Sequence, residues 1–249
     1  MLFARLAARL AYAALAVVTT TIPLSVSAQT RAVLELFTSQ GCSSCPPADK
    51  LFGELAADPG LIVLSLPIDY WDYLGWKDTL AEPRHTARQR AYSKVRGDHE
   101  VYTPQVVVNG SLHALGSDKD AIETAIAKSR ENPATLALPV KLSTADGRLA
   151  VSVAERKDLH IPAEVWVTGL ARSITVMIKR GENKGKTITY HNVARRWLKL
   201  DDWKGTANTW NVPLPQLEEA GVNSAAVLVQ SGSVESPNAI LGAAMAQLR

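Results

Sequence analysis

The chain contains only two cysteines, Cys42 and Cys45, and they stand three positions apart in the stretch GCSSCPP. An apolar run at residues 31–37 precedes them and predicts a buried strand, and the two prolines after them lead into a helical stretch that reaches residue 57. Proline is tolerated in the first turn of a helix, where its missing amide hydrogen has no partner anyway. A second apolar run at residues 61–68 predicts a strand parallel to the first. We therefore expect both sulfurs at a strand-to-helix turn, beside the helix N-terminus.

A purely structural disulfide is disfavoured by the short loop that it would close. A disulfide stabilises a fold mainly by closing a loop in the unfolded chain, and the stabilisation shrinks with the length of that loop. Closing a loop with only Ser43 and Ser44 between the cysteines restricts the unfolded chain very little. The pair is therefore better explained by reactivity or by metal binding.

Metal binding is an open alternative, because Cys-x-x-Cys can supply two ligands of a zinc or copper site. With no third cysteine, further ligands have to come from carboxylates or from the histidines, which are His85, His99, His113, His160 and His191. None of these histidines is paired at ligand spacing. His99 and His113 flank the segment 101–110 and are the two that suit transient copper handling. We expect no resident metal and no bound cofactor.

The first 28 residues have the pattern of a cleaved secretory leader. Arg5 and Arg9 come first, the apolar run 10–18 follows, and small residues lead up to Ala28. We expect cleavage after Ala28, no membrane span in the remaining chain, and a periplasmic or secreted protein in an oxidising compartment. The formal charge falls from +3 to +1 on cleavage, because the leader holds two arginines and no acidic residue. This balance gives no electrostatic case for binding nucleic acid.

Local signals define the elements that follow the second strand. They predict an aromatic segment at residues 69–78 and a helix at 83–95. A β-hairpin that turns at Asn109-Gly110 follows, and then a capped helix at 119–129. The hairpin is entered through the dipeptide Thr103-Pro104. The pattern therefore alternates strands and helices up to about residue 130.

From about residue 136 the pattern changes to short strands that are separated by polar turns. Several strands at such spacing suggest a small antiparallel sandwich. We therefore expect a domain at residues 29–134 and a β-rich, sandwich-like domain at 135–249. The predicted strands of the second domain are 137–142, 148–153, 164–170, 173–179, 186–190, 209–213 and 225–230.

The order of elements over about residues 31–130 resembles the thioredoxin fold, so we expect an α/β thioredoxin-like N-terminal domain. In that fold the first cysteine is exposed at a helix N-terminus, which lowers its pKa and makes it the nucleophile. The resemblance implies that Cys42 attacks and that Cys45 resolves the mixed disulfide. It also implies that Thr103 binds an extended substrate through its backbone and that Pro104 is a cis-proline that faces the cysteines.

Two further groups of residues are candidates for the site. Glu35 interrupts an apolar strand, and it is either a proton acceptor beneath the resolving cysteine or a strand residue that reaches solvent or pairs with an arginine. Tyr70, Trp71, Tyr73 and Trp76 follow the second strand. They form either a binding surface for an unfolded polypeptide or partner, or a plug between the two domains.

Longer strings extend the resemblance over the whole chain after the leader. They are ELFTSQGCSSCPPADKL, DYWDYLGWKD, TARQRAY, VYTPQVVVNG and GENKGKTITYHNV. Together they look like an uncharacterised family of secreted bacterial thioredoxin-like proteins, the domain of unknown function 1223. The family implies a thioredoxin-like domain and a β-rich domain, and it brings no established substrate.

The function that these features predict is an exported thiol–disulfide oxidoreductase that acts through a CxxC redox pair and a mixed disulfide. Its partners would be thiols or disulfides of exported proteins, or a redox partner protein. The serines between the cysteines give no indication of the direction of electron transfer. Handling of copper or another metal, and a non-catalytic binding module, remain the alternatives.

Overall fold

The structure, a computed structural model, describes residues 30–159 and 161–248, so the predicted leader at residues 1–28 lies outside the described residues. The first half of the chain forms β1 (Ala32–Thr38), α1 (Pro46–Leu55), β2 (Leu61–Pro67), a short 3-10 helix (Asp72–Leu74), α2 (Pro83–Arg96), β3 (Gln105–Val108), β4 (Leu112–Leu115) and α3 (Lys119–Ser129). The second half forms β5 (Val140–Ala145), β6 (Arg148–Val153), β7 (Ala163–Met177), β8 (Thr187–Trp203), β9 (Asn208–Pro213), a 3-10 helix (Leu214–Leu217), β10 (Ser224–Ser233) and β11 (Ser236–Gln247). No helix among the described residues is long and apolar enough to cross a membrane.

The strand–helix–strand unit around the cysteines forms as the sequence predicts. β1 and β2 pair in parallel, and β1 also pairs with β3 in the antiparallel direction. The β3–β4 hairpin turns at Asn109 and Gly110, which both have a positive φ, at 49° and 74°. Two positive φ angles in succession give the turn whose twist suits a two-residue hairpin. Asp118 caps α3 by accepting a hydrogen bond from the amide of Ala121 at 2.9 Å.

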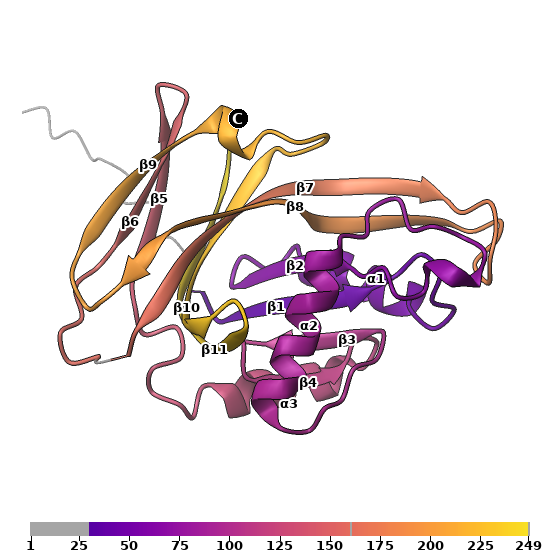
Figure 1. The fold of residues 1–249 in the computed structure, drawn as a ribbon, viewed down its shortest axis with the longest axis horizontal. Coiled ribbons are helices and arrows are strands. Elements are labelled where there is room, and N and C mark those ends of the chain that lie inside the picture. Colours follow the sequence, from indigo (N-terminus) through magenta and orange to yellow (C-terminus); the bar gives the residue numbers. More distant parts are fainter. Residues whose placement is uncertain (1–29, 160, 249) are drawn as a thin grey trace, which may run out of the picture.

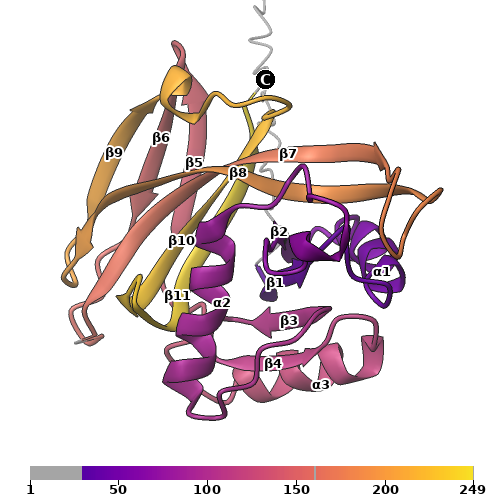
Figure 2. The same cartoon turned by 45° about the vertical axis from the view of Figure 1, so that its right-hand side comes forward.

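The two faces of β1 are covered by different elements. All seven residues of β1 are buried, and side chains of a strand point alternately to opposite faces. Ala32, Leu34 and Leu36 pack with residues of α1 and α3. Val33 and Phe37 pack on the other face with residues of α2, β10 and β11, and Figure 2 shows α1 and α2 on either side of β1 and β2. Whether a β1 residue has an odd or an even number therefore decides whether its side chain faces α2 or α1.

Strands from both halves of the chain belong to one mixed sheet. Its order is β11-β10-β7-β8-β2-β1-β3-β4, and the halves join where β2 pairs with β8 at Ser65 and Val193. The Ser65 hydroxyl also donates to the carbonyl of His191 at 2.7 Å. The long β7–β8 hairpin runs beside β2 and brings its tip close to α1 (Figure 1). A second sheet, β5-β6-β9, packs on the far part of β7, β10 and β11 around a separate core.

The predicted fold class, a thioredoxin-like α/β domain followed by a sandwich, is wrong. The structure is mostly β, with 43% strand and 19% helix, and its eight-stranded sheet takes in strands from both halves. The predicted strands 164–170 and 173–179 are a single strand, β7, and β8 runs on from the predicted strand 186–190 through polar residues to Trp203. Pairing between these two long strands and with β2 and β10 outweighs the local turn signals.

The predicted boundary between residues 134 and 135 falls between α3 and β5. Residues on both sides of that point contribute to the core beneath β1: Val33 and Phe37 from the first part, and Leu228 and Ile240 from the second. The division into two domains stays a prediction.

Candidate redox site

Cys42 and Cys45 are joined by a disulfide, with their Cα atoms 5.4 Å apart. Helix α1 begins directly after Cys45, whose carbonyl accepts hydrogen bonds from the amides of Ala48 and Asp49 at 2.9 and 3.1 Å. Cys45 is fully buried, whereas Cys42 is 6% exposed and is followed by two exposed serines. The two sulfurs are therefore unequal, and Cys42 is the one nearer to solvent.

The dipeptide Thr103-Pro104 lies against the cysteine turn, and its peptide bond is cis. The Ser44 hydroxyl donates to the carbonyl of Thr103 at 3.3 Å and lies 3.4 Å from the sulfur of Cys42. The indole of Trp71 donates to the Thr103 hydroxyl at 2.8 Å. The structure thus brings together the cysteines and the two residues predicted to bind substrate.

The four predicted aromatic residues divide into two groups. The rings of Tyr70, Trp71 and Tyr73 lie in a row, with centroids 5.5 and 6.1 Å apart, and Tyr73 is 74% exposed. Trp76 instead donates to the side chain of Gln40 at 2.7 Å and packs against apolar residues of β7 and β8. The row beside Thr103 is an accessible surface, and Trp76 fills the seam between the two halves.

Glu35 lies on the face of β1 that α2 covers, away from α1. Its carboxylate accepts from Arg88 Nε at 2.7 Å and from the hydroxyl of Tyr92 at 2.5 Å. Burial beside this carboxylate raises the pKa of Tyr92 well above its ordinary value, and the Glu35 charge helps to raise the pKa of Arg88 against the effect of its own burial. Gln230 of β10 completes the network through Arg88 and Tyr92. The sequence left two roles open for Glu35, a proton acceptor or a strand residue that reaches solvent or pairs with an arginine. The structure shows the pairing with an arginine.

Asp49 is the buried carboxyl on the face of α1, and the sequence analysis missed it. It is 2% exposed, its Oδ1 accepts from the Thr38 hydroxyl at 2.8 Å, and its Oδ2 has no hydrogen-bond partner among the described residues. Burial, assisted by the charge of Asp78, raises the pKa of Asp49 to about 8. Asp49 follows Cys45 by four residues, which places both side chains on one side of the helix. That spacing is the sequence signal that would have identified it.

Asp78 holds the backbone just before the cysteines. Its carboxylate accepts from the amide of Gln40 at 2.7 Å and from the amide of Leu80 at 2.8 Å. Burial raises its pKa to about 6. Tyr190 of β8 is buried with them, and burial together with the charges of Asp49 and Asp78 raises its pKa. Two acids and a phenol therefore lie behind the cysteine turn.

Asn183, at the tip of the β7–β8 hairpin, reaches the same turn from the second half of the chain. Its side-chain amide is fully buried and donates to the carbonyl of Gln40 at 3.0 Å and to that of Cys42 at 2.7 Å. Lys186 Nζ donates to the Asn183 Oδ1 at 2.8 Å. From the sequence we predicted only a polar turn here, because the contact joins residues 141 positions apart.

No group of three or more His, Cys, Asp or Glu side chains within residues 30–159 and 161–248 is arranged to hold a metal ion. The Nε2 of His113 lies 3.3 Å from a carboxylate oxygen of Asp98, and its Nδ1 lies 2.9 Å from the hydroxyl oxygen of Tyr102. His160 lies outside the described residues. Because the two sulfurs are bonded to each other, any metal handling by them requires reduction first, and it stays a prediction.

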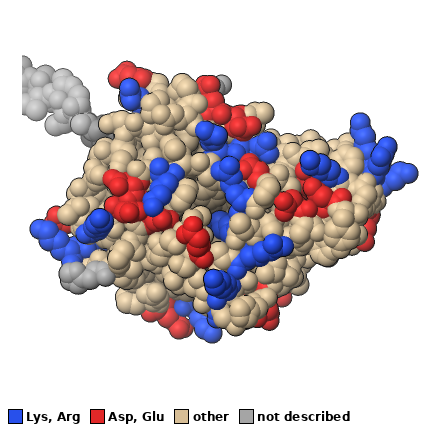
Figure 3. Space-filling model, viewed as in Figure 1, with Lys and Arg blue, Asp and Glu red and all other residues tan. Residues whose placement is uncertain are grey.

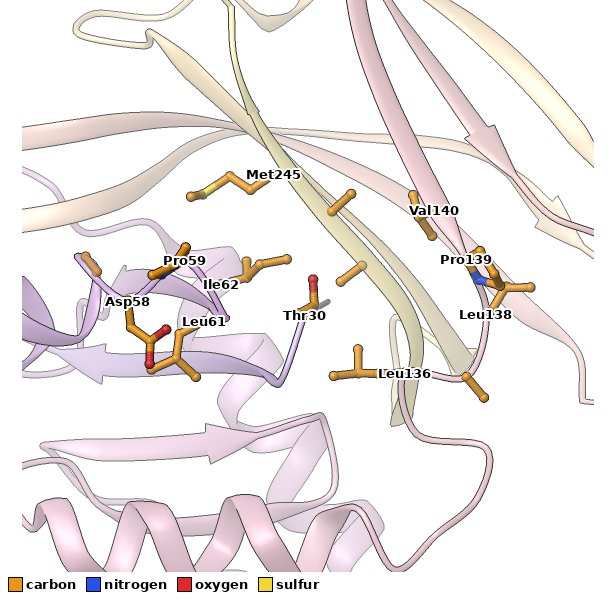
Figure 4. Close-up of a pocket in the computed structure, with 14 residues that line it drawn as sticks. Thr30, Asp58, Pro59, Leu61, Ile62, Leu136, Leu138, Pro139, Val140 and Met245 are labelled. Atoms are coloured by element: carbon orange, nitrogen blue, oxygen red, sulfur yellow. The ribbon is translucent and has the colours of Figure 1, made fainter. Parts of the chain in front are cut away.

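A cavity of about 450 Å³ lies at the opposite ends of β1 and β2 from the cysteines. Figure 4 shows it between the loop of Asp58 and Pro59 on one side and Leu138 to Val140 on the other. Asp58, the one ionisable side chain in its described lining, is paired with Arg31 at 3.2 Å. The cavity therefore offers little chemistry of its own.

A family model and a solved structure each match most of the chain. Residues 33–230 match the family described as "Protein of unknown function (DUF1223)". The chain belongs to this family. The X-ray crystal structure of a protein from Agrobacterium tumefaciens is similar, with 31% sequence identity and a TM-score of 0.79 over 88% of this chain and 95% of that one. A comparison with curated proteins found no match.

Proposed function

We propose that the protein is an exported thiol–disulfide oxidoreductase in which Cys42 forms a mixed disulfide with the substrate. The observation that carries the proposal is the inequality of the two cysteines. Cys42 is 6% exposed in a strand-to-helix turn that Ser44 joins to the backbone of Thr103, whereas Cys45 is fully buried in the same disulfide. Thiol–disulfide exchange needs two unequal sulfurs, one nearer to solvent that is attacked or attacks and a buried neighbour that displaces it.

In the reducing direction, the Cys42 thiolate attacks one sulfur of a substrate disulfide. A bond forms between Cys42 and that sulfur, and the other substrate sulfur leaves as a thiolate. The Cys45 thiolate then attacks the Cys42 sulfur, which forms the Cys42–Cys45 disulfide and releases the second substrate thiolate. Two electrons pass to the substrate, and the protons from the two cysteines end on the released thiols. The same steps in reverse oxidise a substrate dithiol.

Asp49 is suited to receive the proton of Cys45 in this scheme. It lies one helical turn after Cys45, and its Oδ2 is buried without a partner among the described residues. A proton acceptor works best when its pKa lies near the working pH, and burial raises the pKa of Asp49 to about 8. Asp49 thus takes the role that the sequence interpretation gave to Glu35.

The substrate would be an extended polypeptide segment beside its cysteine. The Ser44 hydroxyl lies between the backbone of Thr103 and the Cys42 sulfur, and Trp71 fixes the side chain of Thr103 through a hydrogen bond of 2.8 Å. The exposed ring of Tyr73 extends this surface. Exposed aromatic rings bind unfolded segments through large contact areas with few lost rotamers. Export follows from the predicted leader and agrees with a disulfide that persists in an oxidising compartment.

Alkylation of the reduced protein tests the proposal. The reduced chain is treated with iodoacetamide across about pH 5 to pH 9, and the label is located by peptide mass. We expect Cys42 to be labelled first, with a midpoint below the free-thiol value of about 8.5. Equal labelling of both cysteines with an ordinary midpoint would refute the proposal. Copper or zinc retained by the reduced protein in stoichiometric amount would instead favour metal handling.

A further inference from the structure

We propose that the tip of the β7–β8 hairpin is a working part of the redox site, in which Asn183 positions Cys42 and Lys186 stabilises its thiolate. The inference rests on the proposed function and deepens it. It assigns a role in the exchange reaction to residues that lie far along the chain from the cysteines, in the β-rich half.

The Asn183 amide can adopt only one orientation in its surroundings. Carbonyl oxygens accept hydrogen bonds and do not donate them, so the nitrogen must face the carbonyls of Gln40 and Cys42, which lie 3.0 and 2.7 Å away. The oxygen then faces the Lys186 ammonium at 2.8 Å. The carbonyl of Cys42 also accepts from the amide of Cys45 at 3.2 Å, so both of its lone pairs are used. Asn183 therefore holds the backbone of the attacking residue directly.

The ammonium group of Lys186 is linked to the Cys42 carbonyl through a single group, the side-chain amide of Asn183, which is hydrogen-bonded to both. Its hydrogen bond to the Asn183 oxygen polarises that amide and strengthens the donors on the other side. A nearby cation also favours the charged form of a thiol over the neutral form. The predicted effect of Lys186 is therefore a larger thiolate fraction at Cys42 near neutral pH.

Most of the other charged and titratable groups behind the turn are acidic or phenolic. They are Asp49 of α1, Asp72 and Asp78 of the loop before α2, and Tyr190 of β8. The guanidinium of Arg195 lies farther along this loop, where it donates to the carbonyl of Leu80 at 3.5 Å. An ionised Asp78 disfavours a second negative charge nearby, because like charges repel. Lys186 is the cation that is hydrogen-bonded to the Asn183 amide, so its charge offsets that of Asp78 on the side of Cys42.

The tip is held in place by its own turn and by the first half of the chain. The amide of Gly185 donates to the carbonyl of Ile178 at 2.8 Å, and the amide of Lys186 donates to that of Asn183 at 3.0 Å. Gly181, with a φ of 73°, lies against Trp76 so closely that an added Cβ would come within 3.2 Å of the Trp76 Cβ. Figure 3 shows Lys and Arg side chains gathered at the end of the molecule where Figure 1 draws this tip. The contact with Cys42 is thus built into a defined turn.

The experiment compares alkylation of Cys42 in reduced variants of the full chain. Lys186→Gln should move the midpoint of alkylation up by about half a pH unit and slow the reaction at pH 6 about threefold, because a cation is removed. Lys186→Arg should restore the wild-type midpoint. Lys184→Gln removes an exposed cation from the same turn and is the matched control, with no expected shift.

A coupled variant separates a role in reactivity from a role in folding. Asn183→Ala should shift the midpoint at least as far as Lys186→Gln, and adding Lys186→Gln to it should shift the midpoint by less than Lys186→Gln does alone, because the amide that the lysine polarises is gone. If Asn183→Ala does not fold, the Lys186 variants decide alone. A wild-type midpoint in Lys186→Gln, with Cys42 still labelled first, overturns this inference and leaves the proposed function intact. An ordinary midpoint in the wild type overturns both.

Discussion

The two faces of β1 each bury a carboxyl group, and the two groups are in opposite situations. On the α2 face, Glu35 is paired with Arg88 and Tyr92. On the α1 face, Asp49 has a single hydrogen bond within the described part of the chain, from Thr38, and burial raises its pKa to about 8. A buried charge with full partners fixes a structure, whereas a buried acid with a free oxygen can gain and lose a proton. The comparison assigns a structural role to one carboxyl and a chemical role to the other.

Replacement of Glu35 should give the largest change in stability. Glu35→Ala leaves Arg88 buried without its carboxylate, and breaking a buried pair in this way costs about 3 to 5 kcal/mol. The free energy of unfolding, measured by urea denaturation, should fall by that amount. Glu54→Ala, at an exposed position of α1, is the control and should change it by less than about 0.5 kcal/mol.

The midpoint of Cys42 alkylation should stay the same in the folded fraction of Glu35→Ala. The reason is that Glu35 lies on the face of β1 opposite to α1. A shift of this midpoint, with the fold retained, would show that the α2 face also takes part in the chemistry, and the comparison between the faces would fail.

Replacement of Asp49 should give a smaller change in stability that depends on pH. In the unfolded chain Asp49 ionises near its ordinary value of 3.8, whereas the folded protein keeps its proton up to about pH 8. The folded state therefore binds more protons between these values, and its stability falls as the pH rises through this range. Asp49→Asn removes that loss, and the burial of an asparagine NH2 group without acceptors offsets part of the gain, so the free energy of unfolding at pH 8 should rise by on the order of 3 kcal/mol.

The same variant should slow the exchange step at Cys45 on the order of tenfold at pH 8, where Asp49 is partly ionised in the wild type, because the proton acceptor is gone. Stopped-flow release of the mixed disulfide measures this step, and denaturation at pH 5 and pH 8 measures the stability. Glu54→Gln on the same helix is the control. A variant that is no more stable than wild type at pH 8, or that resolves at the wild-type rate, contradicts the role given to Asp49.

The first half of the fold could be predicted because its signals are local. The prolines after Cys45, the Asn109-Gly110 turn and the Asp118 cap each act within a few residues, and each element that they delimit is present. The proximity of the cysteines and Thr103 was predicted from the resemblance of the element order to the thioredoxin fold.

The remainder depended on contacts between distant residues. Alternate residues of β1 face α1 and α2. Whether Glu35 or its neighbour faces α1 depends on which helix covers which side of the strand, and the local sequence does not determine this. The pairing of β2 with β8 and the reach of Asn183 to Cys42 join segments more than a hundred residues apart. Such contacts are selected by packing of the whole sheet, and local propensity does not encode them.

The most direct test of the account is covalent trapping on the two single-cysteine variants. Cys45→Ser keeps the attacking sulfur and removes the one that resolves, so incubation of the reduced variant with a peptide disulfide should accumulate a stable mixed disulfide on Cys42. Cys42→Ser, which keeps only the buried Cys45, should form little adduct under the same conditions. Intact mass measurement reads both. The account predicts a strong preference for Cys42, and equal adduct on the two variants, or none on either, would contradict it.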